Sequence, residues 1–247
     1  MDVVRHDLEE ESALRIRIKF AKLGYMKFIG HLDTMRYFQK AIRRAGIDIM
    51  YSEGFNPHQK MSFAAPLGVG LTSIGEYMDI EVNSTKSSKE MVDRLNEQMV
   101  EGMKVLSCKK IPDDGKKAMS IVAAADYMIS FREGKEPEGA DIPARFEEYL
   151  SSDSIIVTKK TKKSEKEVDI KGGIYEGKVL EGKIFLKLAS SSAEYLKPEL
   201  VMSGFYNYLG EKMPEFALEI ERTEVYAENE GGFITLEDLG EEIPENM

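Results

Sequence analysis

The pattern that most constrains this chain is a strict alternation of apolar and basic side chains near its start. Residues 14–20 read LRIRIKF, so every second side chain is aliphatic or aromatic and the ones between are cationic. A period of two is typical of a strand with one buried face and one polar face. The polar face would carry Arg15, Arg17 and Lys19. We therefore predict a half-buried strand as the first element.

After this strand, the spacing of apolar residues alternates between helix-like and strand-like patterns. Apolar positions at spacings of three and four predict helices over 30–45 and 86–101, and β-type patterns predict strands over 47–51, 76–82 and 103–110. The resulting order, βαββαβ, is that of a ferredoxin-like unit. The second half repeats it, with strands at 124–132, 154–160 and 216–226, helices at 142–151 and 198–209, and a hairpin turning at Glu176-Gly177. We expect an α+β fold of two ferredoxin-like units, with antiparallel sheets and helices on one face.

These patterns also predict the domain boundaries. An N-terminal extension covers 1–13, the first unit 14–112 and the second unit 119–227. Residues 228–247 hold seven acids and no Lys or Arg, and such a segment is predicted to be disordered.

Charge is distributed unevenly along the chain. The net charge is −10, yet residues 15–60 carry ten Lys/Arg and only three acids. A basic segment on an acidic protein indicates an anionic partner. A single cysteine excludes a disulfide scaffold. The sequence contains no run of 18 apolar residues, so no membrane-spanning helix is predicted. The acidic, polar N-terminus is unlike a secretory signal, so we expect a cytoplasmic protein that does not associate with membranes.

Three segments carry a family resemblance. Residues 30–46 read GHLDTMRYFQKAIRRAG, residues 51–70 read YSEGFNPHQKMSFAAPLGVG and residues 76–82 read EYMDIEV. Over roughly residues 14–82 the chain resembles the radical-SAM-linked protein family, a domain of unknown function encoded beside radical SAM enzymes or fused to their C-terminus. The resemblance implies a radical SAM protein as partner. It implies no reaction, and therefore no catalytic residue.

The basic segment predicts two sets of phosphate-binding side chains. The first set is the strand face of Arg15, Arg17 and Lys19. The second is a helix face formed by Arg36, Lys40, Arg43 and Arg44. If the helix packs on the apolar face of the strand, the two sets point in opposite directions, and the strand set lines an open sheet face that could bind RNA. Tyr37 and Tyr51 are expected to stack on bases. The simpler interpretations are a solvated helix face and a strand face neutralised by acids such as Glu219 and Glu221.

The loop at 51–60 is the second predicted site. Gly54 and Pro57 favour a fixed backbone, on which Asn56, His58 and Lys60 could contact a ligand. His31 and Asp33, at the start of the predicted helix, could share a cavity with His58 and Lys60. These four residues are candidates for acid–base catalysis, and two His with an Asp could hold a metal. The simpler interpretation is that the two histidines only order the backbone, and we expect neither a metal nor a cofactor.

The leading functional hypothesis is an accessory protein of a radical SAM enzyme. It would bind RNA or another phosphate-rich substrate through its basic N-terminal half. One alternative is an enzyme in its own right, acting on RNA or on a small anionic metabolite. A second alternative is a protein-docking module, which predicts an exposed apolar patch ringed by basic residues.

Overall fold

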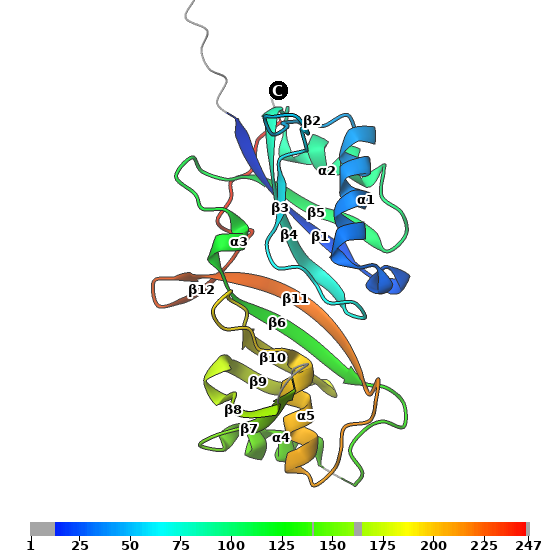
Figure 1. The fold of residues 1–247 in the computed structure, drawn as a ribbon, viewed down its shortest axis with the longest axis vertical. Helices are drawn as coiled ribbons and strands as arrows, with labels where there is room; N and C mark the ends of the chain where they lie inside the picture. The colour runs from blue at the N-terminus through cyan, green and yellow to red at the C-terminus, as the bar shows by residue number, and fades with distance from the viewer. Residues whose placement is uncertain (1–12, 140, 161–164, 246–247) are drawn as a thin grey trace, which may run out of the picture.

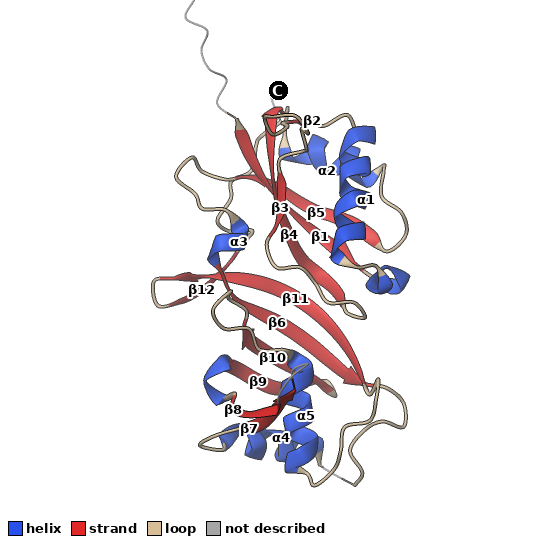
Figure 2. Ribbon diagram, in the orientation of Figure 1, coloured by secondary structure: helices blue, strands red, loops and turns tan. Residues whose placement is uncertain are grey.

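The computed structural model describes residues 13–139, 141–160 and 165–245. The described residues form an α+β fold that is mostly antiparallel sheet, so the predicted class is confirmed (Figures 1 and 2). The N-terminal half contains β1 (Leu14–Lys22), η1 (Gly24–Phe28), α1 (His31–Arg44), β2 (Asp48–Ile49), β3 (Met61–Phe63), β4 (Thr72–Ser84), α2 (Ser88–Asn96) and β5 (Met103–Lys110).

The C-terminal half follows after residues 111–117. It contains α3 (Ala118–Ile121), β6 (Val122–Phe131), α4 (Ile142–Ser151), β7 (Ile156–Lys160), β8 (Glu165–Asp169), η2 (Lys171–Gly173), β9 (Ile174–Leu180), β10 (Lys183–Ala189), α5 (Pro198–Tyr208), β11 (Leu218–Asn229) and β12 (Gly232–Thr235). No helix of the described residues is long and apolar enough to cross a membrane.

One sheet runs through both halves. Among the described residues it has ten strands in the order β5-β1-β4-β11-β6-β10-β9, with β2 and β3 also on β4 and β12 also on β11. The pairs are antiparallel except β4–β11, where Glu221 lies opposite Thr72 and Arg222 opposite Ser73. This parallel contact joins the halves, and Figure 1 shows β11 curving between them.

Each half has its own apolar core. Ile16 and Ile18 of β1 are fully buried with Phe38 and Ile42 of α1, because the alternation of the strand and the period of the helix present matching apolar faces. The C-terminal core packs the apolar face of β6 and β10 against Phe146 of α4 and other aromatic side chains. The helices at 31–44 and 142–151 lie where periodicity predicted them.

Two structural predictions are wrong. The hairpin of β9 and β10 turns at Glu181-Gly182 rather than at 176–177, because both residues adopt positive φ there. The tail is ordered as far as residue 245: β11 continues to Asn229, β12 pairs with it, and Leu236 is fully buried. Apolar side chains of the tail pack into both cores. Their burial offsets the conformational entropy that the tail loses when it is ordered, a gain that its composition does not reveal.

Candidate anion-binding site

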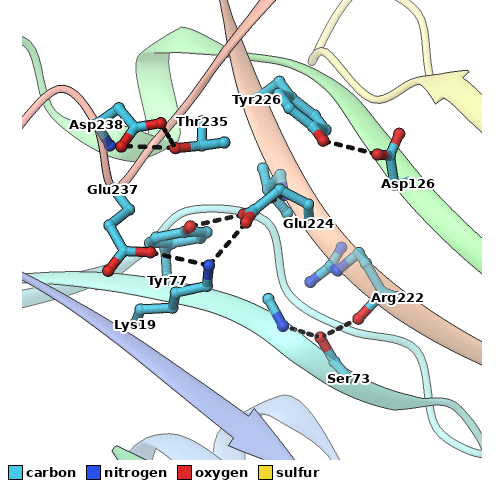
Figure 3. A network of polar contacts seen from close by, with 12 residues as sticks. Lys19, Ser73, Tyr77, Asp126, Arg222, Glu224, Tyr226, Thr235, Glu237 and Asp238 are labelled. Carbon is cyan, nitrogen blue, oxygen red and sulfur yellow. Dashed lines mark hydrogen bonds and ion pairs between the residues drawn. The ribbon is translucent and has the colours of Figure 1, made fainter. Parts of the chain in front are cut away.

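The basic face of β1 is largely neutralised inside the protein. Arg17 is 2% exposed and binds Asp79 through two hydrogen bonds, of 2.8 and 3.1 Å. Lys19 contacts Glu224 at 2.7 Å and Glu237 at 2.9 Å (Figure 3). Burial opposes the charge on Lys19, but these two carboxylates outweigh burial and raise its pKa.

The open platform predicted on β1 is therefore wrong. The second half and the tail cover this face and supply acids for it, although not the two acids named in the prediction. Glu219 lies instead near Arg132, at 3.8 Å, and Glu221 contacts Thr72. The acids that reach Lys19 come from β11 and from the tail, both more than 200 residues away in sequence.

Arg15 differs from Arg17 and Lys19. Its guanidinium donates to three main-chain carbonyls, those of Pro112 at 2.6 Å, Asp113 at 2.8 Å and Gly115 at 2.6 Å. No carboxylate of the described residues forms an ion pair with it. Carbonyl dipoles fix the orientation of the guanidinium without cancelling its charge. Arg15 is thus a positioned cation whose charge is uncompensated.

A cavity of about 410 Å³ opens beside Arg15. Its walls come from the end of the 51–60 loop, from β3, from β4 and from the segment after β5. The polar lining includes Arg15, His58, Lys60, Ser62, Glu81 and Lys117. Its volume lies within the range typical of small-molecule sites.

The register of the sheet places these side chains together. Arg15 on β1 lies opposite Glu81 on β4, and Ser62 on β3 lies opposite Asp79. Lys60 forms an ion pair with Glu81 at 2.8 Å and remains about one-third exposed. Paired residues of neighbouring strands share one face, so the cavity belongs to the face opposite α1.

The loop before β3 is held in one shape. The backbone N–H of Ser52 donates to the carbonyl of His58 at 2.8 Å. The hydroxyl of Ser52 lies 2.8 Å from Nδ1 of His58 and accepts a hydrogen bond from the backbone N–H of His58. Gly54 provides a positive φ of 108° at the bend. His58 is exposed and Lys60 is partly exposed, and the ordered loop sets His58 at the rim of the cavity. Tyr51 and Asn56 are exposed in the same loop.

The charges around the cavity leave an excess of cations. Asp79, which also lines the cavity, is bound by Arg17, and Glu81 is bound by Lys60. Arg15 and the exposed Lys117 then have no acidic partner among the described residues. Two cations without counter-charges beside a cavity favour an anionic ligand. Lys117 was not predicted, since it lies in a segment whose sequence, PDDGKKA, is typical of a linker.

His31 does not reach this cavity, contrary to expectation. Its ring packs edge-on against Phe63, with centroids 5.1 Å apart, in a much smaller cavity that Lys22 and Glu76 also line. Asp33 is exposed and pairs with Arg36, at 3.3 Å. The set of His31, Asp33, His58 and Lys60 is therefore not assembled, and no group of three His, Cys, Asp or Glu within the described residues could hold a metal ion.

The helix cations form a separate exposed surface. Arg36, Lys40, Arg43 and Arg44 are all exposed on α1. The helix packs on the apolar face of β1, with Phe38 and Phe20 centroids 4.7 Å apart, so these cations point away from the cavity. The predicted opposite orientation of the two basic sets is confirmed.

The comparisons with known proteins identify a family without a described activity. Residues 15–198 match the family described as "Uncharacterized protein conserved in bacteria (DUF2344)", and the chain therefore belongs to it. No curated protein matches. Among solved structures, a chain of the "Crystal Structure of a Cbf5-Nop10-Gar1 Complex" is similar, with 12% identity and a TM-score of 0.42 over 87% of this chain and 50% of that one. The chain thus spans about half the length of that matched chain.

Proposed function

We propose that this member of the DUF2344 family binds a phosphate-bearing ligand in the cavity beside Arg15, and that it acts as an accessory protein rather than as an enzyme. The observation that carries the proposal is the charge of Arg15, which is oriented by three carbonyls and cancelled by none of the described carboxylates. The fixed charge of Arg15 attracts a phosphate although three of its N–H groups already donate to carbonyls, and Lys117 and Lys60 add point charges.

The phosphate could belong to an RNA strand or to a free metabolite. The chemistry of recognition is the same in both cases, and the cavity is of a size for a small molecule or for a nucleotide of a single strand. Within the cavity, His58 could donate or accept a hydrogen bond. Because His31 lines a different cavity, it cannot form an acid–base pair with His58, and the enzyme alternative loses that support.

A titration with two probes tests the proposal. Adenosine monophosphate and a short single-stranded RNA are titrated separately into wild-type protein and into His58→Ala, Lys60→Gln and Lys117→Gln variants. We expect each variant to weaken binding about three- to tenfold, the loss of one charge-assisted hydrogen bond, with nearly unchanged melting temperature. RNA affinity should fall with a log–log salt slope of roughly −0.7 per phosphate.

The matched control is Lys40→Gln, which removes an exposed charge from the opposite side of the sheet. Binding of RNA alone would assign the phosphate to a nucleic acid, and binding of the nucleotide alone would assign it to a metabolite. Affinities that respond to Lys40→Gln and not to Lys117→Gln would move the site to α1. No binding of either probe would refute the proposal.

The fold and cellular context form part of the same proposal. The strand orders β5-β1-β4 with β2 and β3, and β11-β6-β10-β9, support two ferredoxin-like units joined through β4 and β11. The resemblance in residues 14–82 supports a radical SAM protein as the partner, and such a partnership would place the chain in the cytoplasm.

A second surface supports the docking alternative. Tyr25, Phe28, Leu32 and Val69 are each more than 60% exposed. They lie in neighbouring segments, because the N–H of Gly70 donates to the carbonyl of Lys27 at 2.8 Å. Lys27 also lies over the ring of Phe28, and the exposed Arg36 follows Leu32 by one turn of α1. An apolar patch beside cations fits an apolar protein surface with an acidic rim.

We propose the radical SAM protein as the partner on this patch, tested by co-purification after co-expression of the two proteins. Leu32→Asp should abolish co-purification, whereas Leu106→Asp, at an exposed position on β5, should not. Equal recovery with both variants would exclude this surface.

A further inference from the structure

The two ends of the ten-stranded sheet are treated differently. At one end, the edge of β5 is occupied: the side chain of Asn96 bonds both the N–H and the carbonyl of Val105 at 2.9 Å, and Glu241 exchanges two backbone hydrogen bonds of 2.8 Å with Lys110. At the other end, β9 pairs with β10 and with no other strand of the described residues. An unprotected edge strand presents free N–H and C=O groups to another chain.

The side chains of β9 are also unusual for a solvent-facing edge. Tyr175 is 44% exposed and Leu180 is 40% exposed. Lys178 and Glu176 project on one face, where they pair with each other at 2.6 Å. The strand thus combines exposed apolar side chains with one charge of each sign.

We propose that two copies of this chain pair antiparallel through β9 to form a symmetric dimer with a continuous sheet. The sequence of the strand, IYEGKVL, is complementary to its own reverse about Gly177. In that register Glu176 lies opposite the partner's Lys178, and Lys178 lies opposite the partner's Glu176. Tyr175 lies opposite the partner's Val179, so an apolar pair flanks each ionic pair.

The geometry of β9 limits both the size of the dimer interface and the number of copies that can join. The register of β9 on β10 skips Tyr175, since Lys187 lies opposite Glu176 and Leu188 opposite Ile174. Regular pairing would therefore be centred on residues 176–178, with Tyr175 and the partner's Val179 at its ends. A two-fold contact of this kind uses each edge once and closes at two copies, which prevents fibre growth. Its small area predicts a dissociation constant in the micromolar range. The dimer does not depend on the proposed ligand.

Charge exchange on the full-length chain tests the register directly. Sedimentation velocity over a concentration series should show a monomer–dimer equilibrium for the wild-type protein. Glu176→Lys places Lys opposite Lys at both symmetric positions, and Lys178→Glu places Glu opposite Glu. Each variant should weaken dimerisation about tenfold or more, because two attractive pairs become repulsive.

Rescue experiments separate this register from a general effect of charge. An equal mixture of the two variants should form heterodimers, since every cross-strand pair then joins Lys to Glu, and the double variant with both charges exchanged should dimerise like wild type. Lys183→Glu, on β10 one strand inward, is the matched control and should not change the equilibrium. Circular dichroism verifies folding of each variant. A wild-type protein that stays monomeric at the highest concentration, or single variants that dimerise like wild type, would overturn the proposal.

Discussion

Substitution of Glu76 by Gln should be among the most destabilising single changes in this chain. Glu76 binds Arg222 through two hydrogen bonds, of 2.8 and 2.6 Å, and the guanidinium is 1% exposed. A second buried cation, Lys22, lines the same small cavity as Glu76 and is 2% exposed. Burial lowers the pKa of Lys22, Glu76 opposes this shift, and the charge of Arg222 adds to it.

The magnitude follows from this arrangement of charges. Removing one member of a buried ion pair typically costs about 3–5 kcal/mol, because an uncompensated charge stays in the interior. Glu76→Gln leaves two buried cations without their carboxylate, so we expect a loss at the upper end of that range. Arg222→Met leaves Glu76 beside Lys22, which still compensates it, so we expect a loss at the lower end.

Urea unfolding measures both effects. The free energies of unfolding are compared at equal m-values, since a changed m would indicate a different denatured state. Asp33→Asn, which breaks the exposed pair with Arg36, is the control and should cost about 0.5 kcal/mol or less. A loss below about 1 kcal/mol for Glu76→Gln, or a larger loss for Arg222→Met than for Glu76→Gln, would contradict the reasoning.

Three further predictions concern single side chains. Cys108 is buried and burial raises the pKa of its thiol, so a thiol reagent should label it only after unfolding. Gly75→Ala should cost at least about 2 kcal/mol, measured by urea unfolding, because the new Cβ would lie 2.5 Å from the carbonyl oxygen of Thr223 where β4 meets β11. Burial raises the pKa of Asp126 above its ordinary value of 3.8, although the hydroxyl of Tyr226 donates to it. The folded state therefore holds that proton more tightly, and this stabilisation is lost as pH rises through the folded pKa. In thermal melts, the stability of wild type relative to Asp126→Asn should therefore fall between pH 3.8 and pH 7.

Local patterns predicted the elements well where one side of an element is apolar. The alternation at 14–20 and the periodicity at 30–45 correspond to β1 and α1, because burial of one face determines both the pattern and the conformation. Short strands were missed. Residues 61–63 are too few to show an alternation of apolar and polar side chains. They form β3 because their backbone pairs with residues 78–80 of β4.

The tail shows why composition failed as a guide to order. Its excess of acids would repel if the segment were isolated, which is the basis of the disorder prediction. In the folded chain those acids face cations far away in sequence: Glu237 binds Lys19 of β1, and Glu242 lies 3.9 Å from Lys109 of β5. The tail also contributes Leu236, which is fully buried. A rule that counts charges within a segment cannot include partners supplied by the fold.

The position of the candidate site depends on which face of the sheet each residue occupies, and only part of this follows from the sequence. On β3, Ser62 and Phe63 are neighbours in sequence but point to opposite faces, so Ser62 lines the cavity and Phe63 packs under His31. His31 and His58 are therefore separated by the sheet itself. The same alternation groups Arg15, Arg17 and Lys19 on one face, yet β11 and the tail neutralise Lys19, and Asp79 neutralises Arg17. Of these three cations, only Arg15 is bound by carbonyls without a carboxylate of the described residues, and it borders the cavity of about 410 Å³. For that reason Arg15, rather than the basic strand as a whole, is where an anion is expected to bind.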